Sequence, residues 1–77
     1  MKMEYDKKAD AIYIYFSDAP YSYGEDLDNE RRIDYDASGN PIGVELLCVS
    51  EGVIADDLPY RGQIESILGK QHIKVFA

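Results

Sequence analysis

The residues best spaced for chemistry in this chain run from Asp34 to Glu45, DYDASGNPIGVE. Their spacing fits a calcium-binding loop, in which oxygen ligands recur at alternate positions. Asp34, Asp36 and Ser38 occupy the first, third and fifth positions. Gly39 takes the sixth, where the loop turns sharply, and Glu45 the twelfth, where such loops have a bidentate carboxylate. The candidate metal ligands are therefore Asp34, Asp36, Ser38 and Glu45.

The residues on either side of this segment favour a different interpretation. A calcium loop of this kind lies between two helices, but both flanks here alternate apolar and polar residues with a period of two, which is typical of half-buried strands. Between them, Ser38-Gly39 is a turn dipeptide. We therefore interpret the segment as a β-hairpin and keep calcium binding as an alternative.

The hairpin interpretation predicts a register. Only a loop with an even number of residues, two or four, places the apolar residues of both strands on one face. The expected pairs on that face are Tyr35 with Ile42, Ile33 with Val44 and Arg31 with Leu46. On the opposite face, Arg32 is expected across from Glu45, where opposite charges attract, and Gly43 across from Asp34.

The face that carries Arg32 and Asp34 is the candidate binding surface. If the neighbouring strand continues the sheet, two tyrosines join this face and make it both aromatic and charged. Arginine and tyrosine are enriched where proteins bind one another. The candidate interface residues are Tyr13, Tyr15, Arg32, Asp34, Gly43, Glu45 and Leu47.

Catalysis is the third hypothesis. Asp34 and Glu45 would form a pair of carboxylates on adjacent strands, as in a small hydrolase. Against it, Arg32 is placed to neutralise Glu45, and an open sheet face excludes little water. The single histidine, His72, is expected in a terminal strand with no serine or cysteine nearby. We expect no enzyme and no cofactor.

The rest of the chain predicts one α+β domain spanning residues 1–77. Strands are expected at residues 2–5 and 11–16, with Ile12, Ile14 and Phe16 on one face. A loop or irregular edge is expected at 18–24, followed by a solvated acidic run at 25–30. A helix is expected between Asp57 and Gly69, and a last short strand at 72–77. The expected architecture is an antiparallel β-meander of about four strands, with the helix packed on one face.

Charge and composition limit the partners. The net charge of −7 disfavours nucleic acid and suits a basic protein partner. A second copy of the chain is the other partner expected at the candidate interface. The one cysteine, Cys48, excludes an internal disulfide and is expected to be a small buried hydrophobe. Without a signal-like or membrane-spanning apolar run, a cytoplasmic protein with no membrane contact is expected.

Two blocks, YDKKADAIYI from Tyr5 to Ile14 and IDYDASGNPIGVELL from Ile33 to Leu47, resemble the signature of the domain of unknown function 2283 family, a group of small prokaryotic domains. The resemblance implies a compact antiparallel sheet with a helix and no established activity. Some members are thought to be encoded beside small nuclease-like toxins, which suggests an antitoxin-like role. The matching positions are Tyr5, Asp6, Ala9, Asp10, Tyr13, Asp34, Asp36, Gly39, Gly43 and Glu45.

Overall fold

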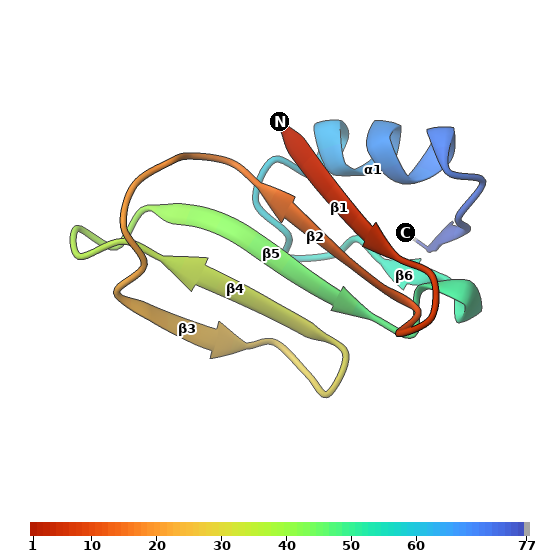
Figure 1. The fold of residues 1–77 in the computed structure, drawn as a ribbon, viewed down its shortest axis with the longest axis horizontal. Coiled ribbons are helices and arrows are strands. Elements are labelled where there is room, and N and C mark those ends of the chain that lie inside the picture. Colours follow the sequence, from red (N-terminus) through yellow and green to blue (C-terminus); the bar gives the residue numbers. More distant parts are fainter. Residues whose placement is uncertain (77) are drawn as a thin grey trace.

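The computed structural model describes residues 1–76 and contains a five-stranded antiparallel sheet (Figure 1). The expected α+β class is confirmed, but the sheet has five strands where about four were expected. The additional one, Tyr23–Asp26, lies in the region expected to be loop and solvated acids. The strands are β1 (Lys2–Asp6), β2 (Ala11–Tyr15), β3 (Tyr23–Asp26), β4 (Arg31–Tyr35) and β5 (Pro41–Leu47).

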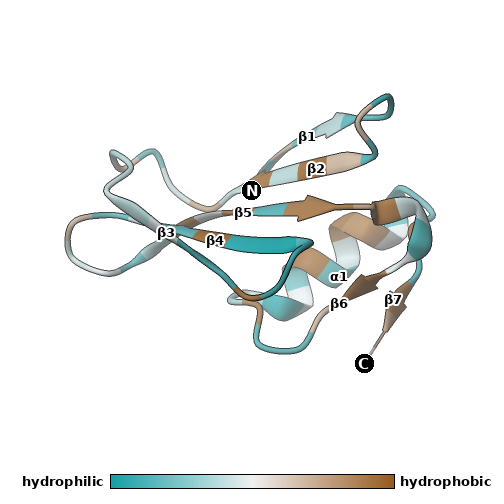
Figure 2. Cartoon of the chain, turned by 90° about the horizontal axis from the view of Figure 1, so that it is seen from below, coloured by the Kyte–Doolittle hydropathy of each residue, from teal (hydrophilic) through white to brown (hydrophobic). Residues whose placement is uncertain are grey.

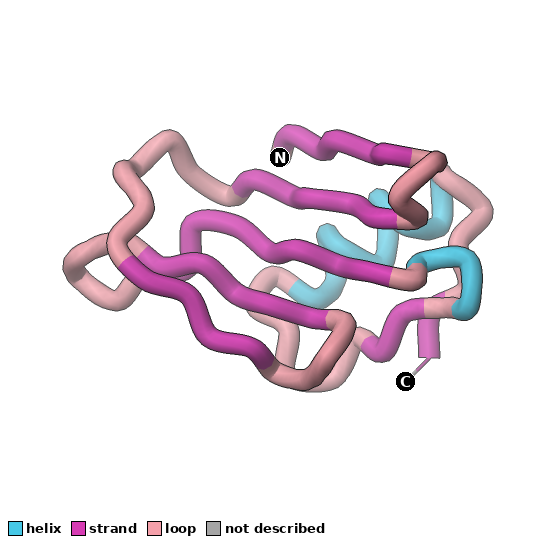
Figure 3. Tube along the Cα trace, turned by 60° about the horizontal axis from the view of Figure 1, so that its bottom comes forward, coloured by secondary structure: helices cyan, strands magenta, loops and turns pink. Residues whose placement is uncertain are grey.

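The strand order is β1-β2-β5-β4-β3, so the sheet is not a simple meander. The β1–β2 hairpin pairs with β5, and the connection from β2 to β3 crosses the ends of the two strands between them (Figures 1 and 3). This arrangement places β2 directly beside β5. The tyrosines of β2 are therefore immediate neighbours of Gly43 and Glu45.

The second layer covers one face of the sheet (Figure 2). It consists of a 3₁₀ turn at Val49–Glu51, β6 (Val53–Ile54), α1 (Arg61–Lys70) and β7 (Val75–Phe76), with β6 and β7 paired in parallel. The expected C-terminal strand is thus two residues long in the described chain, and Ala77, also expected in it, lies outside the described residues. The core between the layers contains Ile12, Ile14, Ile33, Val44, Leu46, Val49, Val53, Leu58, Ile64, Leu68 and Ile73.

The β4–β5 hairpin follows the expected register for four pairs and then departs from it. Arg31, Arg32, Ile33 and Asp34 pair as expected, but Tyr35 lies opposite Pro41 instead of Ile42. A bulge absorbs Ile42, so residues 36–40 form a loop with an odd number of residues. Ile42 is buried yet lies outside the core cluster, and it lines a hollow with Tyr13 and Asp34 on the other face.

The helix begins and ends later than expected. Tyr60, expected within the apolar stripe, precedes the first turn with a left-handed backbone (φ 53°) and is 49% exposed. Ile64 and Leu68 are the buried residues that dock α1 on the sheet, and Lys70 lies in its last turn as expected. No helix among residues 1–76 is long and apolar enough to span a bilayer.

Replacing Gly62 with alanine should stabilise the protein. A methyl group there would meet no atom within 4 Å, and alanine is the better helix former by about 1 kcal/mol. We expect Gly62→Ala to raise the melting temperature by about 4–8 °C in thermal unfolding followed by circular dichroism. Gly52→Ala is the opposing control, because Gly52 has φ 98° and the Phe76 ring crowds the new methyl group. An unchanged or lower melting temperature for Gly62→Ala would contradict this account of α1.

Candidate interaction surface

The sheet face turned away from α1, here called the outer face, gathers the seven candidate interface residues. Strand pairing aligns them in two rows, because alternate residues of each strand share a face. The first row is Lys2, Tyr15, Gly43, Asp34 and Gly24, and the second is Glu4, Tyr13, Glu45, Arg32 and Asp26. Leu47, 37% exposed, lies beyond the second row, opposite Ala11.

A hydrogen bond joins β2 to β4 over the strand between them. The Tyr13 hydroxyl donates to Asp34 Oδ2 at 2.6 Å. The ring passes over Gly43, where a Cβ would lie 2.6 Å from Tyr13 Cε1 and 2.7 Å from Cζ. Burial, followed by the hydrogen bond and the charge of Asp34, raises the pKa of Tyr13 well above its ordinary value. The hydroxyl therefore remains a donor at neutral pH.

A second glycine, Gly24 on β3, also lies beneath a side chain of the neighbouring strand. A Cβ there would lie 2.6 Å from both Nε and Nη2 of Arg32 and 2.7 Å from Asp34 Oδ1. In its absence Arg32 extends over β3, with Nη1 3.0 Å from Asp26 Oδ1 and Nη2 3.3 Å from the Tyr21 hydroxyl. Its Nε lies 3.4 Å from Asp34 Oδ1.

These contacts correct the expected partner of Arg32. The register does set Arg32 across from Glu45, but its guanidinium pairs with Asp26 and Asp34. Sequence reasoning missed Tyr21, Gly24 and Asp26, because they fall in the strand and loop that were not recognised. Gly24 is the one signal of a close approach at this strand, but a glycine is equally typical of a loop.

Of the four candidate calcium ligands, Asp36 and Ser38 lie in the hairpin loop, Asp34 in β4 and Glu45 in β5. Asp36 caps the hairpin loop, where its Oδ1 accepts the backbone N–H groups of Ser38 and Asn40, each at 2.9 Å. Those hydrogen bonds, led by that from Asn40, lower the pKa of Asp36. Asp34 lies beneath Tyr13, and Glu45 occupies the other row of the outer face. Within residues 1–76 none of them belongs to a group of acidic, cysteine or histidine ligands that converge.

The two carboxylates of the hydrolase hypothesis line different hollows. Asp34 lines a hollow with Tyr13 and Tyr21, whereas Glu45 lines two others, one beside β1 and one beside Arg32. Asp34 Oδ1 is buried and accepts no hydrogen bond among the described residues. Within the described part of the chain, its one close cation is Arg32. His72 lies in an exposed turn after α1 and not in a strand.

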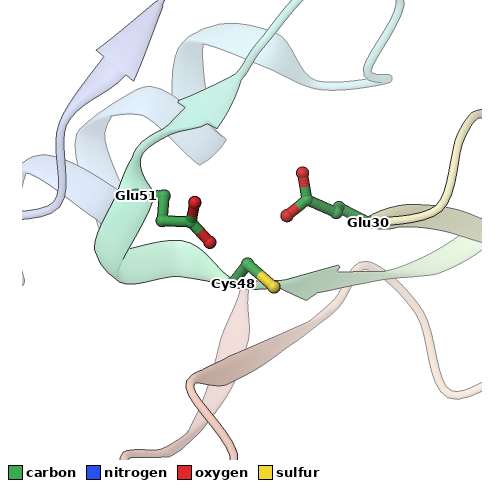
Figure 4. Close-up of side chains that lie close together, drawn as sticks. All are labelled: Glu30, Cys48 and Glu51. Atoms are coloured by element: carbon green, nitrogen blue, oxygen red, sulfur yellow. The ribbon is translucent and has the colours of Figure 1, made fainter.

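Cys48 is not the buried hydrophobe that its place in the alternation predicted. It has a left-handed backbone (φ 54°) and is partly exposed where β5 ends. Its Sγ lies near the carboxylates of Glu30 and Glu51, and ligand atoms of all three fall within 4.8 Å of one another (Figure 4). Hydrogen bonding to Glu30, then burial, then nearby negative charge raise the pKa of Cys48 to about 11. The thiol is therefore protonated at neutral pH.

Cys48 should react slowly with iodoacetamide, because the thiolate is the nucleophile. We expect the alkylation rate to rise with pH toward a midpoint near 11. Glu30→Gln removes the largest cause and should shift the midpoint down, with faster alkylation at pH 8. Asp57→Asn, an equal change of charge elsewhere on the surface, is the control. Alkylation of the unaltered protein with a midpoint near that of a free thiol would contradict the described environment.

Gly43→Ala should be destabilising because the new methyl group collides with the Tyr13 ring. Overpacking of this kind costs about 1–3 kcal/mol of unfolding free energy. Combining it with Tyr13→Ala removes the collision, so the double variant should lose less stability than the two single changes added together. Urea unfolding of the four proteins measures the coupling. Strict additivity would show that Tyr13 does not lie over Gly43.

Comparisons with known proteins give one match. A family model described as "Protein of unknown function (DUF2283)" matches residues 2–50. No curated protein and no solved structure matches the chain.

Proposed function

The chain belongs to the DUF2283 family of proteins of unknown function, and we propose that it is a non-catalytic protein-binding module whose outer face receives the partner. The observation that supports the proposal is that this face is uncovered and its polar side chains are already ordered. The second layer leaves it uncovered (Figure 2), and its polar side chains are already fixed to one another.

Fixed side chains favour binding because little conformational freedom remains to be lost on association. Tyr13 is held by Asp34, and Arg32 by Asp26 and Asp34. Tyrosine and arginine are also the residue types enriched at binding hot spots. With Leu47 and Tyr21 exposed beside them, the outer face combines ordered polar groups with apolar area.

The negative charge of the protein favours a positively charged partner. The protein has a net charge of −7, and acidic residues outnumber basic ones on the outer face. Opposite potentials speed association and suppress unsuitable partners. The proposed partner is a basic protein, which includes an antitoxin-like role against a basic toxin. Self-association is the other form of the same proposal, and it requires oppositely charged parts of two copies to meet.

Two variants with the same substitution test the outer face. Glu45→Lys reverses a charge on it, and Glu65→Lys reverses one on α1, in the opposite layer. Among the described residues, Glu65 has one polar partner, Arg61, in a surface ion pair, so the loss of that pair costs little stability. In capture of proteins from the native host, Glu45→Lys should weaken retention of a basic partner by about tenfold or more, because an attractive contact becomes repulsive.

Sedimentation velocity on the same three proteins reads out self-association. Equal capture and equal sedimentation for the unaltered protein and Glu45→Lys would overturn the proposed surface. A larger loss for Glu65→Lys than for Glu45→Lys would place the partner on the opposite layer and would also contradict it.

A further inference from the structure

One hollow on the outer face has an unusual lining. It lies where residues 16–22 leave β2 and cross toward β3, and it has a volume of about 320 Å³. Three tyrosines and two aspartates contribute to it. The lining residues are Tyr13, Tyr15, Ser17, Asp18, Ala19, Tyr21, Asp34 and Ile42.

Side-chain contacts fix two of the three aromatic rings. Tyr13 and Tyr15 lie with ring centroids 4.6 Å apart and planes tilted by 55°. Both hydroxyls donate to carboxylates, that of Tyr13 to Asp34 and that of Tyr15 to Glu4. A phenol that donates to a carboxylate has a more electron-rich ring, which strengthens its attraction for a cation. Tyr21 is 58% exposed and supplies the third side of the lining.

One of these rings already contacts a cation within the molecule. The Lys2 ammonium lies 5.3 Å from the centroid of Tyr15, within the range of a cation–π contact. The aspartates add to the attraction. Asp18 is exposed at the rim. Asp34 Oδ1 is buried, with Arg32 Nε at 3.4 Å, and accepts no hydrogen bond from residues 1–76, so its charge is only partly compensated.

Building on the proposed function, we infer that this hollow is an aromatic cage that takes a cationic side chain, arginine or lysine, of the protein partner. Tyrosine rings with carboxylates at the rim are the chemistry that recognises such groups. Ile42 forms an apolar floor because the bulge at Asp34/Tyr35 turns it away from the core. The floor suits the methylene stem of the inserted side chain.

The direct test is a titration of the ¹⁵N-labelled protein with three short peptides, followed by NMR. The probes are acetyl-Gly-Arg-Gly-amide, the same peptide with lysine, and the same peptide with citrulline, a neutral isostere of arginine. We expect saturable shifts at Tyr13, Asp18, Tyr21 and Ile42 with the arginine or lysine peptide, and no saturation with citrulline. The stronger of the two cationic peptides identifies the preferred head group. Equal shifts with citrulline, or no shifts at millimolar peptide, would overturn the cage.

Variants of the exposed rim keep the test independent of folding. Tyr21→Ala and Asp18→Asn should each weaken the cationic peptide about two- to fivefold, as expected for one exposed cation–π or charge contact. Tyr60→Ala and Asp57→Asn remove the same groups from the opposite layer and should leave the affinity unchanged. Tyr21→Phe retains the ring and should restore most of the binding. Equal effects from the rim and control variants would show that the peptide senses only net charge.

Partner capture separates failure of the cage from failure of the proposed function. If the partner is captured and Glu45→Lys releases it, while Tyr21→Ala and Asp18→Asn do not, the outer face stands and the cage is overturned. If the cationic peptides saturate the hollow but Glu45→Lys captures the partner normally, the cage stands and the proposed surface is overturned.

Discussion

The Tyr13 hydroxyl reaches Asp34 only because Gly43, on the strand between them, has no side chain. This contact spans three adjacent strands on a face that no other helix or strand of residues 1–76 covers. The Tyr13 ring occupies the space of the missing Cβ, and the backbone of β5 at Gly43 is buried. The outer face therefore has its own order, separate from the apolar core on the other side. Gly24 extends that order to β3, where Arg32 lies over the second glycine and reaches Asp26. The cost of mid-strand glycine, which loses more freedom on folding than other residues, is offset by these contacts.

Much of this could be predicted from the sequence, because alternation over the hairpin is strong. Ile33 and Val44 had to share a face, and that parity alone paired Arg32 with Glu45 and Asp34 with Gly43. The same parity pairs Tyr35 with Ile42 only if the ladder is regular as far as Tyr35. A bulge breaks that assumption, and nothing in the order of residues 41–43 distinguishes a strand from a bulged strand. The misplacement of Ile42 follows from this. So does the hollow beneath the crossing connection, because a regular hairpin would direct Ile42 into the core.

Non-local contacts account for the rest of what the sequence could not predict. β3 contains a glycine and two acids among its four residues, so its local propensity for strand is low. It forms because β4 offers a free edge, and because Arg32 and Tyr35 contact its side chains. The neighbours of Cys48 are equally non-local. Glu30 is 18 residues away along the chain, and alternation in β5 gives no sign that the strand ends at Leu47 with a left-handed residue after it.

The family match ends close to the boundary between the two layers. The matched segment, residues 2–50, contains the whole five-stranded sheet and ends just before the strands and helix that cover it. Taken alone, that segment would present Ile12, Ile14, Ile33, Val44 and Leu46 to water, and each such side chain gains about 1.5–3 kcal/mol by burial. A chain limited to this segment would need a second sheet, from another copy or a neighbouring domain, over the same apolar surface. In this protein residues 53–76 occupy that place, so the C-terminal third covers the apolar surface of the sheet and leaves its outer face uncovered.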